Sequence, residues 1–343
     1  MKKYILLIIL ILTSVKLFAQ GKKGFQVLIG HENDVFGPNN RDENYTGGLK
    51  LEVLTPQWGQ FWQPFFRFKQ VKSLNIQRIA FGGTGYTPQD LAASTIVLND
   101  RPYASLVYGS IGNTSYSPTN KWLVQSDLII GWMGTKSPGQ LQAYLHRNNW
   151  LGSTRPVPLG WDNQIGFDGA MIANYNTRVQ YFLSDYNPKS KVSFVQTSLT
   201  GRLDVGTYMI NLQGGFKLNL LNWNSSILHD YNPSHPTFNE EDFTVQPKKL
   251  RFNLFIEPQM RLAAYNATLE GLMFTDNSVY TIPSSEVNRL LFELNTGINI
   301  QFYDLIYVKY MLFLRSREFE GGKPLHAWGG ITLGLSPSRW NNN

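Results

Sequence analysis

The sequence contains no cysteine among its 343 residues, so the chain folds without disulfides. It also contains no block rich in Lys and Arg that is interleaved with aromatic residues, although its formal net charge is +7. The composition therefore gives no reason to expect nucleic-acid binding. A mild basic charge of this kind is compatible with an anionic membrane surface.

Long hydrophobic runs are absent beyond the N-terminus, where no segment offers 18 uninterrupted apolar residues. This excludes a helical membrane span in the rest of the chain. It does not exclude a membrane β-barrel, whose strands need only about 9–11 residues and alternate weakly in hydropathy. The mean hydropathy of -0.24 suits a soluble protein or a barrel equally, whereas the 14% aromatic content favours a barrel with interfacial girdles.

The N-terminus has the three parts of a secretory signal peptide. Lys2 and Lys3 precede an apolar run over 4–17, and Ala19 stands where a signal peptidase would cleave. The alternative is a transmembrane anchor, but the run is shorter than the roughly 20 residues that a spanning helix needs. We expect residues 1–19 to be removed and 20–343 to form a single domain in the bacterial outer membrane.

The remaining sequence alternates between apolar and polar residues in segments separated by Gly, Pro, Asn and Asp, as strands and turns do. Leu49, Leu51 and Val53, for example, alternate with Lys50 and Glu52. No clean helical stretch is visible. The expected strands are 25–34, 44–55, 74–86, 103–115, 122–134, 168–184, 191–203, 206–221, 249–265, 287–303, 305–317 and 325–337.

Twelve is an even number, as a closed antiparallel barrel made from one bacterial chain requires. The alternative all-β fold is a soluble sandwich, whose strands would be nearer 5–6 residues long. Several segments here exceed ten residues. The sequence therefore predicts an all-β fold, a closed antiparallel transmembrane β-barrel.

Polar residues gather in the connections that follow odd-numbered strands. If the first strand begins on the periplasmic side, these connections all lie at the extracellular end. The first contains Asp34 among other carboxylates, amides and glycines, which are the hard oxygen donors that calcium prefers. The same residue types also make ordinary turns, and composition alone favours the turn over a metal site.

The second and third connections offer fewer but more specific groups. Asp100 and Arg101 form a pair that could hold a substrate phosphate or could anchor the loop. His146 could act as a general base if it meets a water molecule, although a lone histidine is more often an ordinary surface or interface residue. Because the three connections share one end of the predicted barrel, we expect a site there.

The residues in these connections are also where the sequence resembles a known family, the outer-membrane lipid A 3′-O-deacylases of the LpxR type. Gln142 precedes His146 by four residues, and the other similar motifs lie over 25–166. They are Glu32-Asn33-Asp34-Val35-Phe36, Tyr45-Thr46-Gly47-Gly48-Leu49, Tyr86-Thr87-Pro88, Asp100-Arg101-Pro102-Tyr103-Ala104 and Gly160-Trp161-Asp162-Asn163-Gln164.

The resemblance implies a 12-stranded barrel that removes the 3′-linked acyloxyacyl group of lipid A, with calcium as cofactor. It implies catalytic positions for His146, Asn33 and Thr46, with the histidine as general base toward water, and a calcium ligand at Asp34. Segment 147–161 contains no acidic residue that could complete a calcium site after the histidine. The expected partners are lipopolysaccharide and the membrane around a monomer.

Two other functions stay open at this stage. An outer-membrane phospholipase on a similar barrel would use a serine paired with a histidine, and no Ser-His-Asp spacing of the usual kind stands out here. A channel or structural barrel without enzymatic activity would keep the loops and lack the chemistry. A small barrel packed with side chains would conduct ions poorly.

Overall fold

The fold is described from a computed structural model. It describes residues 25–38, 43–55, 73–148, 155–184, 192–224, 249–275, 277–303 and 305–336. The expected signal peptide and most of the connection between the eighth and ninth strands lie outside these residues. The cleavage site after Ala19 therefore stays a prediction.

All twelve strands are present close to where the alternating pattern predicts them. Their bounds are β1 Gln26–Asn33, β2 Asn44–Thr55, β3 Leu74–Thr87, β4 Ala104–Ser117, β5 Trp122–Met133, β6 Ala170–Phe182, β7 Val192–Gly206, β8 Met209–Trp223, β9 Leu250–Asn266, β10 Leu290–Phe302, β11 Ile306–Ser316 and β12 Leu325–Leu335.

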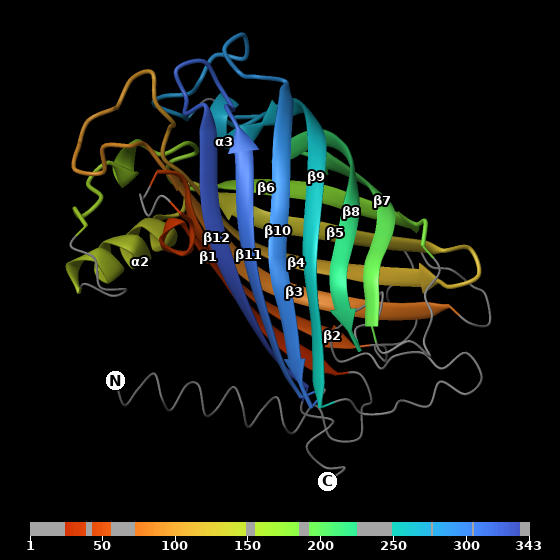
Figure 1. The fold of residues 1–343 in the computed structure, drawn as a ribbon. Helices are drawn as coiled ribbons and strands as arrows, with labels where there is room; N and C mark the ends of the chain where they lie inside the picture. The colour runs from red at the N-terminus through yellow and green to blue at the C-terminus, as the bar shows by residue number, and fades with distance from the viewer. Residues whose placement is uncertain are drawn as a thin grey trace.

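The strands form one closed antiparallel barrel in which each strand pairs with its neighbours in sequence. Closure is made by β1 and β12, which pair from Val27 with Leu335 to Asn33 with Gly329. Closing the sheet leaves no unpaired strand edge, as a spanning sheet requires in lipid. The predicted fold class is confirmed, and Figure 1 shows the barrel from the side.

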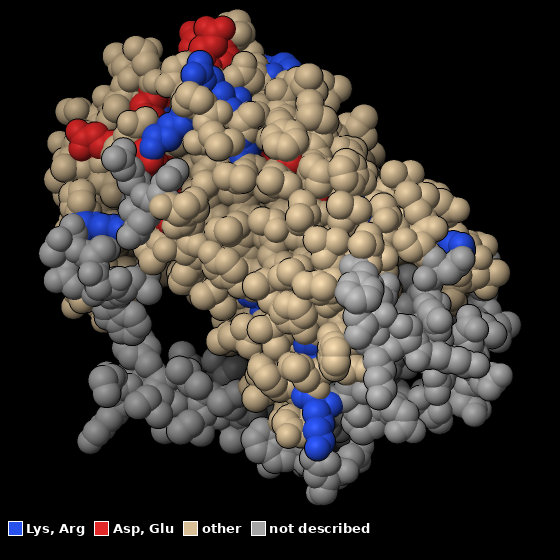
Figure 2. Space-filling model, viewed as in Figure 1, with Lys and Arg blue, Asp and Glu red and all other residues tan. Residues whose placement is uncertain are grey.

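Side chains alternate between the two faces of the wall. On β8, Leu212 and Phe216 point outward and are exposed, whereas Gln213 and Lys217 point into the lumen and are buried. An apolar outer face over a polar interior is the pattern of an outer-membrane barrel. The face seen in Figure 2 is correspondingly free of charge over the middle of the strands, and its acidic groups gather at the end that carries α3.

Charged side chains inside the lumen are paired with one another. Arg78 contacts Asp127 at 2.5 Å, and Glu52 lies 3.0 Å from Lys50. Arg178 pairs with Glu257 farther round the wall. Pairing lets these charges stay in a confined interior at a tolerable desolvation cost, so the lumen is filled by matched ions.

Aromatic side chains ring one rim of the barrel. Trp122 at the start of β5 packs on Tyr181 near the end of β6, with ring centroids 5.0 Å apart. Trp223 and Phe302, at the ends of β8 and β10, are exposed at the same rim. Tryptophan and tyrosine favour the membrane–water interface, so this rim matches the aromatic girdle expected from the composition.

The expectation of no helix is wrong at one place that matters. Helix α2, Lys136–Arg147, lies in the connection between β5 and β6, and the one-turn helix α3, Ala267–Glu270, follows β9. Both lie at one end of the barrel, called the α2 end below, and Figure 1 shows α2 outside the wall. No helix in the described part of the chain is long and apolar enough to cross a membrane.

Candidate active site

The three connections lie at the α2 end, as the strand order predicts, and two of them, after β1 and after β5, border a groove of about 550 Å³. The groove brings together three of the predicted site residues, Asn33, Thr46 and His146. It is also lined by Gln142, Trp161 and Arg155, and by outward-facing residues of β1 to β4. The three connections therefore share one end of the barrel as predicted, but the connection between β3 and β4 contributes no residue to the groove.

The groove lies on the outside of the barrel rather than in its lumen. Its floor includes Ile29, Leu49 and Phe81, which point away from the lumen and are more than half exposed. Its roof is α2, which packs over β3 and β4. A site in this place opens onto the surface that a membrane barrel turns toward lipid.

Helix α2 is held in place by close packing on Trp161. A Cβ atom on Gly139 would lie 2.6 Å from Cγ of Trp161, so only glycine lets the helix approach this closely. The other side of Trp161 packs on Tyr103, with ring centroids 4.9 Å apart. Its indole N–H donates to Oε1 of Gln142 at 2.9 Å. The tryptophan thus fixes both the position of α2 and the direction of one of its side chains.

The turn that carries the chain from β5 into α2 also depends on glycine. Gly134 has a φ of 76°, in the left-handed region that residues with a side chain rarely adopt. A Cβ atom there would lie 1.7 Å from the carbonyl oxygen of Gly166. The helix therefore starts from a turn that no other residue would make without distortion.

His146 is held by a hydrogen bond that sets its tautomer. Its Nδ1 lies 2.7 Å from the carbonyl oxygen of Pro156. Because a carbonyl oxygen only accepts, Nδ1 carries the proton and donates it. In the neutral ring the lone pair is then on Nε2, which is the form that a general base requires. His146 stands in the last turn of α2 and lines the groove.

Asn33 and Thr46 approach the groove from two paired strands. Oδ1 of Asn33 accepts from the backbone N–H of Val35 at 2.8 Å. The other end of this side chain is its amide NH₂, which can donate hydrogen bonds. Thr46 is buried, and its hydroxyl lies 2.5 Å from the hydroxyl of Thr87. Gly47 allows β1 and β2 to approach closely, since a Cβ atom on Gly47 would lie 2.9 Å from the Glu32 carbonyl oxygen.

Sequence reasoning missed the orientation of Gln142. Because Oε1 accepts from Trp161, the amide nitrogen Nε2 is fixed as a donor, and it is buried without a hydrogen-bond partner. A buried donor without a partner is costly, and in a site it is suited to an oxygen that carries negative charge. The spacing of four residues between Gln142 and His146 places both on one face of a helix, which is the signal that could have revealed it.

A second histidine, His31, also lines the groove and was not singled out. Its Nδ1 donates to the carbonyl oxygen of Gly48 at 3.0 Å, so it has the same tautomer as His146. Its ring packs edge-on against Phe36. The groove therefore contains two histidines with an Nε2 lone pair, on the wall and on the helix.

Asp34 is not in the groove, although it follows Asn33 directly. Its side chain is 1% exposed, and Oδ2 accepts from the backbone N–H of Glu43 at 3.0 Å. Oδ1 lies 3.8 Å from Nε2 of His326 on β12. These contacts are those of a carboxylate that organises the connection between β1 and β2.

The donors around Asp34 do not fit a calcium ion. Calcium takes six to eight oxygen ligands, yet Glu43 is ion-paired with Lys323, and Glu32 accepts from the indole N–H of Trp328 at 3.4 Å. The described residues include no group of three or more His, Cys, Asp or Glu side chains that could hold a metal. Calcium binding by Asp34 stays a prediction from the resemblance alone.

Arg101 and Asp100 lie away from the groove. The guanidinium of Arg101 is fully buried; it contacts Glu318 at 2.6 Å and Thr268 at 2.8 Å. Asp100 accepts the backbone N–H of Gln89 at 2.7 Å. These contacts correspond to the loop-anchoring alternative, because an inward-facing, ion-paired guanidinium does not meet a substrate phosphate.

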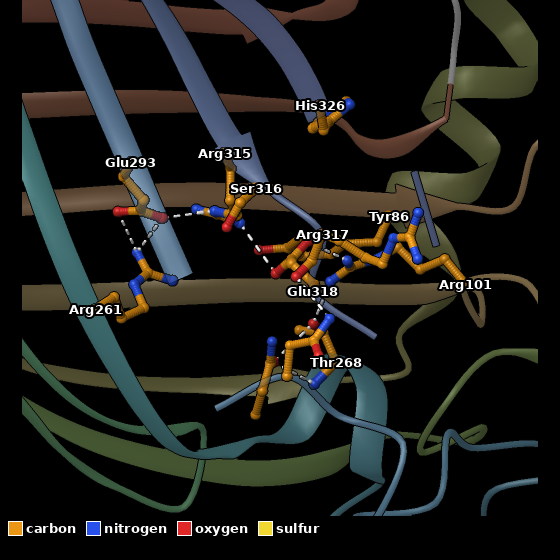
Figure 3. A network of polar contacts seen from close by, with 12 residues as sticks. Tyr86, Arg101, Arg261, Thr268, Glu293, Arg315, Ser316, Arg317, Glu318 and His326 are labelled. Atoms are coloured by element: carbon orange, nitrogen blue, oxygen red, sulfur yellow. Dashed lines mark hydrogen bonds and ion pairs between the residues drawn. The ribbon is translucent and has the colours of Figure 1, made fainter. Parts of the chain in front are cut away.

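The contacts of Arg101 extend into a network that fills the α2 end of the lumen (Figure 3). Arg315 links Glu318 to Glu293 on the neighbouring strand, at 3.2 Å and 2.6 Å, and Glu293 also contacts Arg261 at 2.9 Å. Burial alone would raise the pKa of Glu318, but the guanidinium groups of Arg101 and Arg315 lower it to about 2. The network thus ties the connections at this end to the barrel wall.

Comparison with known proteins agrees with this architecture. The sequence model of a family described as outer membrane protein LpxR matches residues 5–336. The chain belongs to the LpxR family of outer membrane proteins. Membership in the LpxR family, together with the closed 12-stranded barrel, places the protein in the outer membrane.

Among solved structures, LpxR from Salmonella typhimurium matches with a TM-score of 0.68 and 17% sequence identity, covering 90% of this chain and 99% of that one. At this identity the match shows a shared fold. The β domain of the Bordetella autotransporter Brka matches with a TM-score of 0.42 and 6% identity, covering 91% of this chain and 98% of that one. No curated protein matches the sequence.

Proposed function

We propose that this protein is an outer-membrane esterase that removes the 3′-linked acyloxyacyl group from lipid A. The observation that carries the proposal is the outer groove, in which His146 and Gln142 on α2 lie over Asn33 and the apolar residues of the barrel wall. A polar catalytic set beside a lipid-facing surface suits a substrate whose ester lies at the membrane interface. Membership of the LpxR family supports the same substrate class.

The first step is attack of water on the ester carbonyl. Nε2 of His146 takes a proton from the water molecule as the oxygen forms its bond to the carbonyl carbon. The Pro156 carbonyl oxygen, which accepts from Nδ1, supports the positive charge that develops on the ring. No serine or other protein nucleophile takes part in this step.

The second step is collapse of the tetrahedral intermediate. Its oxyanion would be stabilised by Nε2 of Gln142, which is held in direction by Trp161, and by the amide NH₂ of Asn33. The ester C–O bond then breaks, and His146 returns its proton to the leaving alkoxide. The products are the free acyloxyacyl acid and the deacylated sugar hydroxyl. Thr46, which is bonded to Thr87, positions the wall beneath the reacting ester.

A serine hydrolase in this groove is disfavoured by position. Ser137 lines the groove on α2, nine residues before His146 on the same helix. At 1.5 Å per residue, their backbones are about 13 Å apart along the helix axis. That separation is too large for a Ser–His hydrogen bond, so the described groove residues include no serine placed to pair with His146.

The proposal is tested with purified protein in mixed micelles. Lipid A and a diacyl phospholipid are supplied separately, and the products are identified by mass spectrometry. We expect loss of one acyloxyacyl group from lipid A and no change in the phospholipid. Release of lysophospholipid would instead support the phospholipase, and unchanged spectra for both lipids would contradict an esterase function.

A further inference from the structure

The outward-facing positions of β1 to β4 form three rows beneath α2, as their strand register shows. The first row, at the α2 end, contains Asn33, Gly47 and Gly85. The second contains His31, Leu49, Gly83 and Val107. The third contains Ile29, Leu51 and Phe81. The rows therefore change from polar and small near His146 to apolar farther along the wall.

Gly83 makes a gap in the second row. Its neighbours on either side, Leu49 and Val107, are 51% and 37% exposed and form the two walls of the gap. Below it, Phe81 is 65% exposed. The gap thus connects the polar first row to the apolar outer surface of the barrel.

The fold itself does not require glycine at this position. A Cβ atom on Gly83 would meet its nearest neighbours, the Leu106 carbonyl oxygen and Val107 Cγ2, at 3.4 and 3.9 Å, which are ordinary contacts. By contrast, a Cβ atom on the adjacent Gly82 would lie 2.7 Å from the Tyr108 ring. The absence of a side chain at Gly83 therefore leaves room for another molecule, and a ligand that approaches the backbone closely is one of the reasons for glycine within a strand.

We propose that the gap at Gly83 is the seat of the acyl chain of the ester, with Leu49 and Val107 as its walls. This inference rests on the proposed esterase function and adds the position and direction of the chain. The occupant is a hydrocarbon chain because the walls are apolar and continue without a break into the surface around Phe81 and Ile29. A chain already in the membrane reaches the gap by moving sideways along that surface.

The spacing of the rows also indicates which carbons of the acyl chain would lie in the gap. Outward-facing residues on one strand are about 7 Å apart, so Gly83 lies about 7 Å and Phe81 about 14 Å from Gly85 in the first row. An ester carbonyl between His146 and Asn33 would place its first carbons over the first row and the following ones over Gly83. An acetyl ester would end before the gap, whereas a myristoyl ester would pass through it.

The first test compares acetyl and myristoyl esters of one alcohol. Gly83→Leu fills the gap, so we expect kcat/KM for the myristoyl ester to fall roughly 10- to 100-fold, while kcat/KM for the acetyl ester stays within about twofold. Gly214→Leu is the matched control, because Gly214 is an exposed strand glycine on β8 with nothing within 4 Å of its Cβ position. If Gly83→Leu lowered kcat/KM equally for both esters, or left the ratio of the two values unchanged, the gap would not be the seat of the acyl chain.

The second test measures binding of the acyl chain at the gap independently of ester hydrolysis. Since the sequence has no cysteine, Gly83→Cys introduces a single thiol at the gap, and Gly214→Cys introduces one on the far wall. We expect myristate, but not acetate, to slow alkylation of the thiol at position 83 and to leave the thiol at position 214 unaffected. Equal protection at both positions, or none at position 83, would refute the seat even if the protein hydrolyses lipid A. Protection without hydrolysis of any ester would refute the esterase and leave the seat standing.

Discussion

At the scale of single residues, the two groove histidines are the candidates for the base in the proposed reaction. His146 and His31 both donate from Nδ1 to a backbone carbonyl, so in both neutral rings the lone pair is on Nε2. They differ in their surroundings, because His146 shares a helix face with the oriented amide of Gln142. We therefore propose His146, rather than His31, as the base.

The first prediction separates these two residues. His146→Gln removes the base but keeps a side chain of similar length, so kcat should fall about 10²–10⁴-fold. His31→Gln should cost less than about tenfold, because His31 would only shape the wall. Both are measured as initial rates on lipid A with purified protein. A large loss of kcat in His31→Gln with a small loss in His146→Gln would show that His31, not His146, is the general base.

The second prediction concerns the oxyanion donor. Gln142→Ala removes Nε2, which is buried without a partner and would be satisfied only by the charged intermediate. The expected result is a loss of about 10²–10³-fold in kcat with little change in KM, as for other oxyanion donors. A rise in KM with an unchanged kcat would show that Gln142 binds substrate instead.

The third prediction concerns calcium, which the resemblance implies and the described donors do not fit. Because Asp34 and Glu43 are engaged with the protein, chelation by EDTA should leave hydrolysis within about twofold of its starting rate. Activity is followed before and after dialysis against the chelator. If activity were lost on dialysis and returned with added calcium, hydrolysis would depend on calcium, as the family resemblance implies.

Residue-level prediction from the sequence succeeded where type and position in the chain were sufficient. The gathering of the connections at one end followed from the strand order, whereas the choice of Asn33, Thr46 and His146 came from the family resemblance. The separation of Asn33 from Asp34 could not be foreseen, because it depends on which face each residue takes at the end of β1. Asn33 is extended, with φ of -164° and ψ of 154°, so successive side chains point to opposite sides.

At the scale of elements, the strands were predictable and helix α2 was not. Alternation with a period of two is a local property, and it located all twelve strands. Helix α2 has Pro138 and Gly139 in its first turn, so its sequence gives a weak helical signal. The helix is held by Trp161, more than twenty residues after that glycine, and such a contact is invisible in a local pattern.

The fourth prediction tests this anchoring. Trp161→Ala removes both the surface on which Gly139 packs and the donor that orients Gln142. We expect hydrolysis to fall at least about tenfold, since misplacement of catalytic groups by about 1 Å costs up to about 100-fold. The barrel should remain intact, as judged by its β-sheet circular dichroism and by heat-dependent mobility on a gel. Trp122→Ala, at the opposite rim, serves as the control and should retain activity.

At the scale of the whole molecule, the buried ion network makes the α2 end sensitive to acid. The pKa of Glu318 is lowered from its ordinary value of 4.5 to about 2. A depressed pKa contributes stability above pH 4.5, and that contribution is lost as the pH falls toward 2. The connections that border the groove should therefore loosen in this window.

The fifth prediction measures that loss. The melting temperature of the protein in detergent should fall between pH 4.5 and 2, and part of the fall should disappear in Glu318→Gln. At neutral pH the same variant should be less stable by about 3 kcal/mol or more, because Arg101 loses its buried charge partner. If the melting temperatures of the wild type and Glu318→Gln fell in parallel between pH 4.5 and 2, Glu318 would not be the cause of the loss of stability in acid.

The central claim is that the groove outside the barrel wall, with His146 as base, deacylates lipid A. Its most direct test is mass spectrometry of lipid A from cells that express either the wild type or His146→Ala at equal levels in the outer membrane. The account predicts that lipid A loses an acyloxyacyl mass with the wild type and keeps it with the variant. Lipid A of identical mass in the two strains would contradict the account.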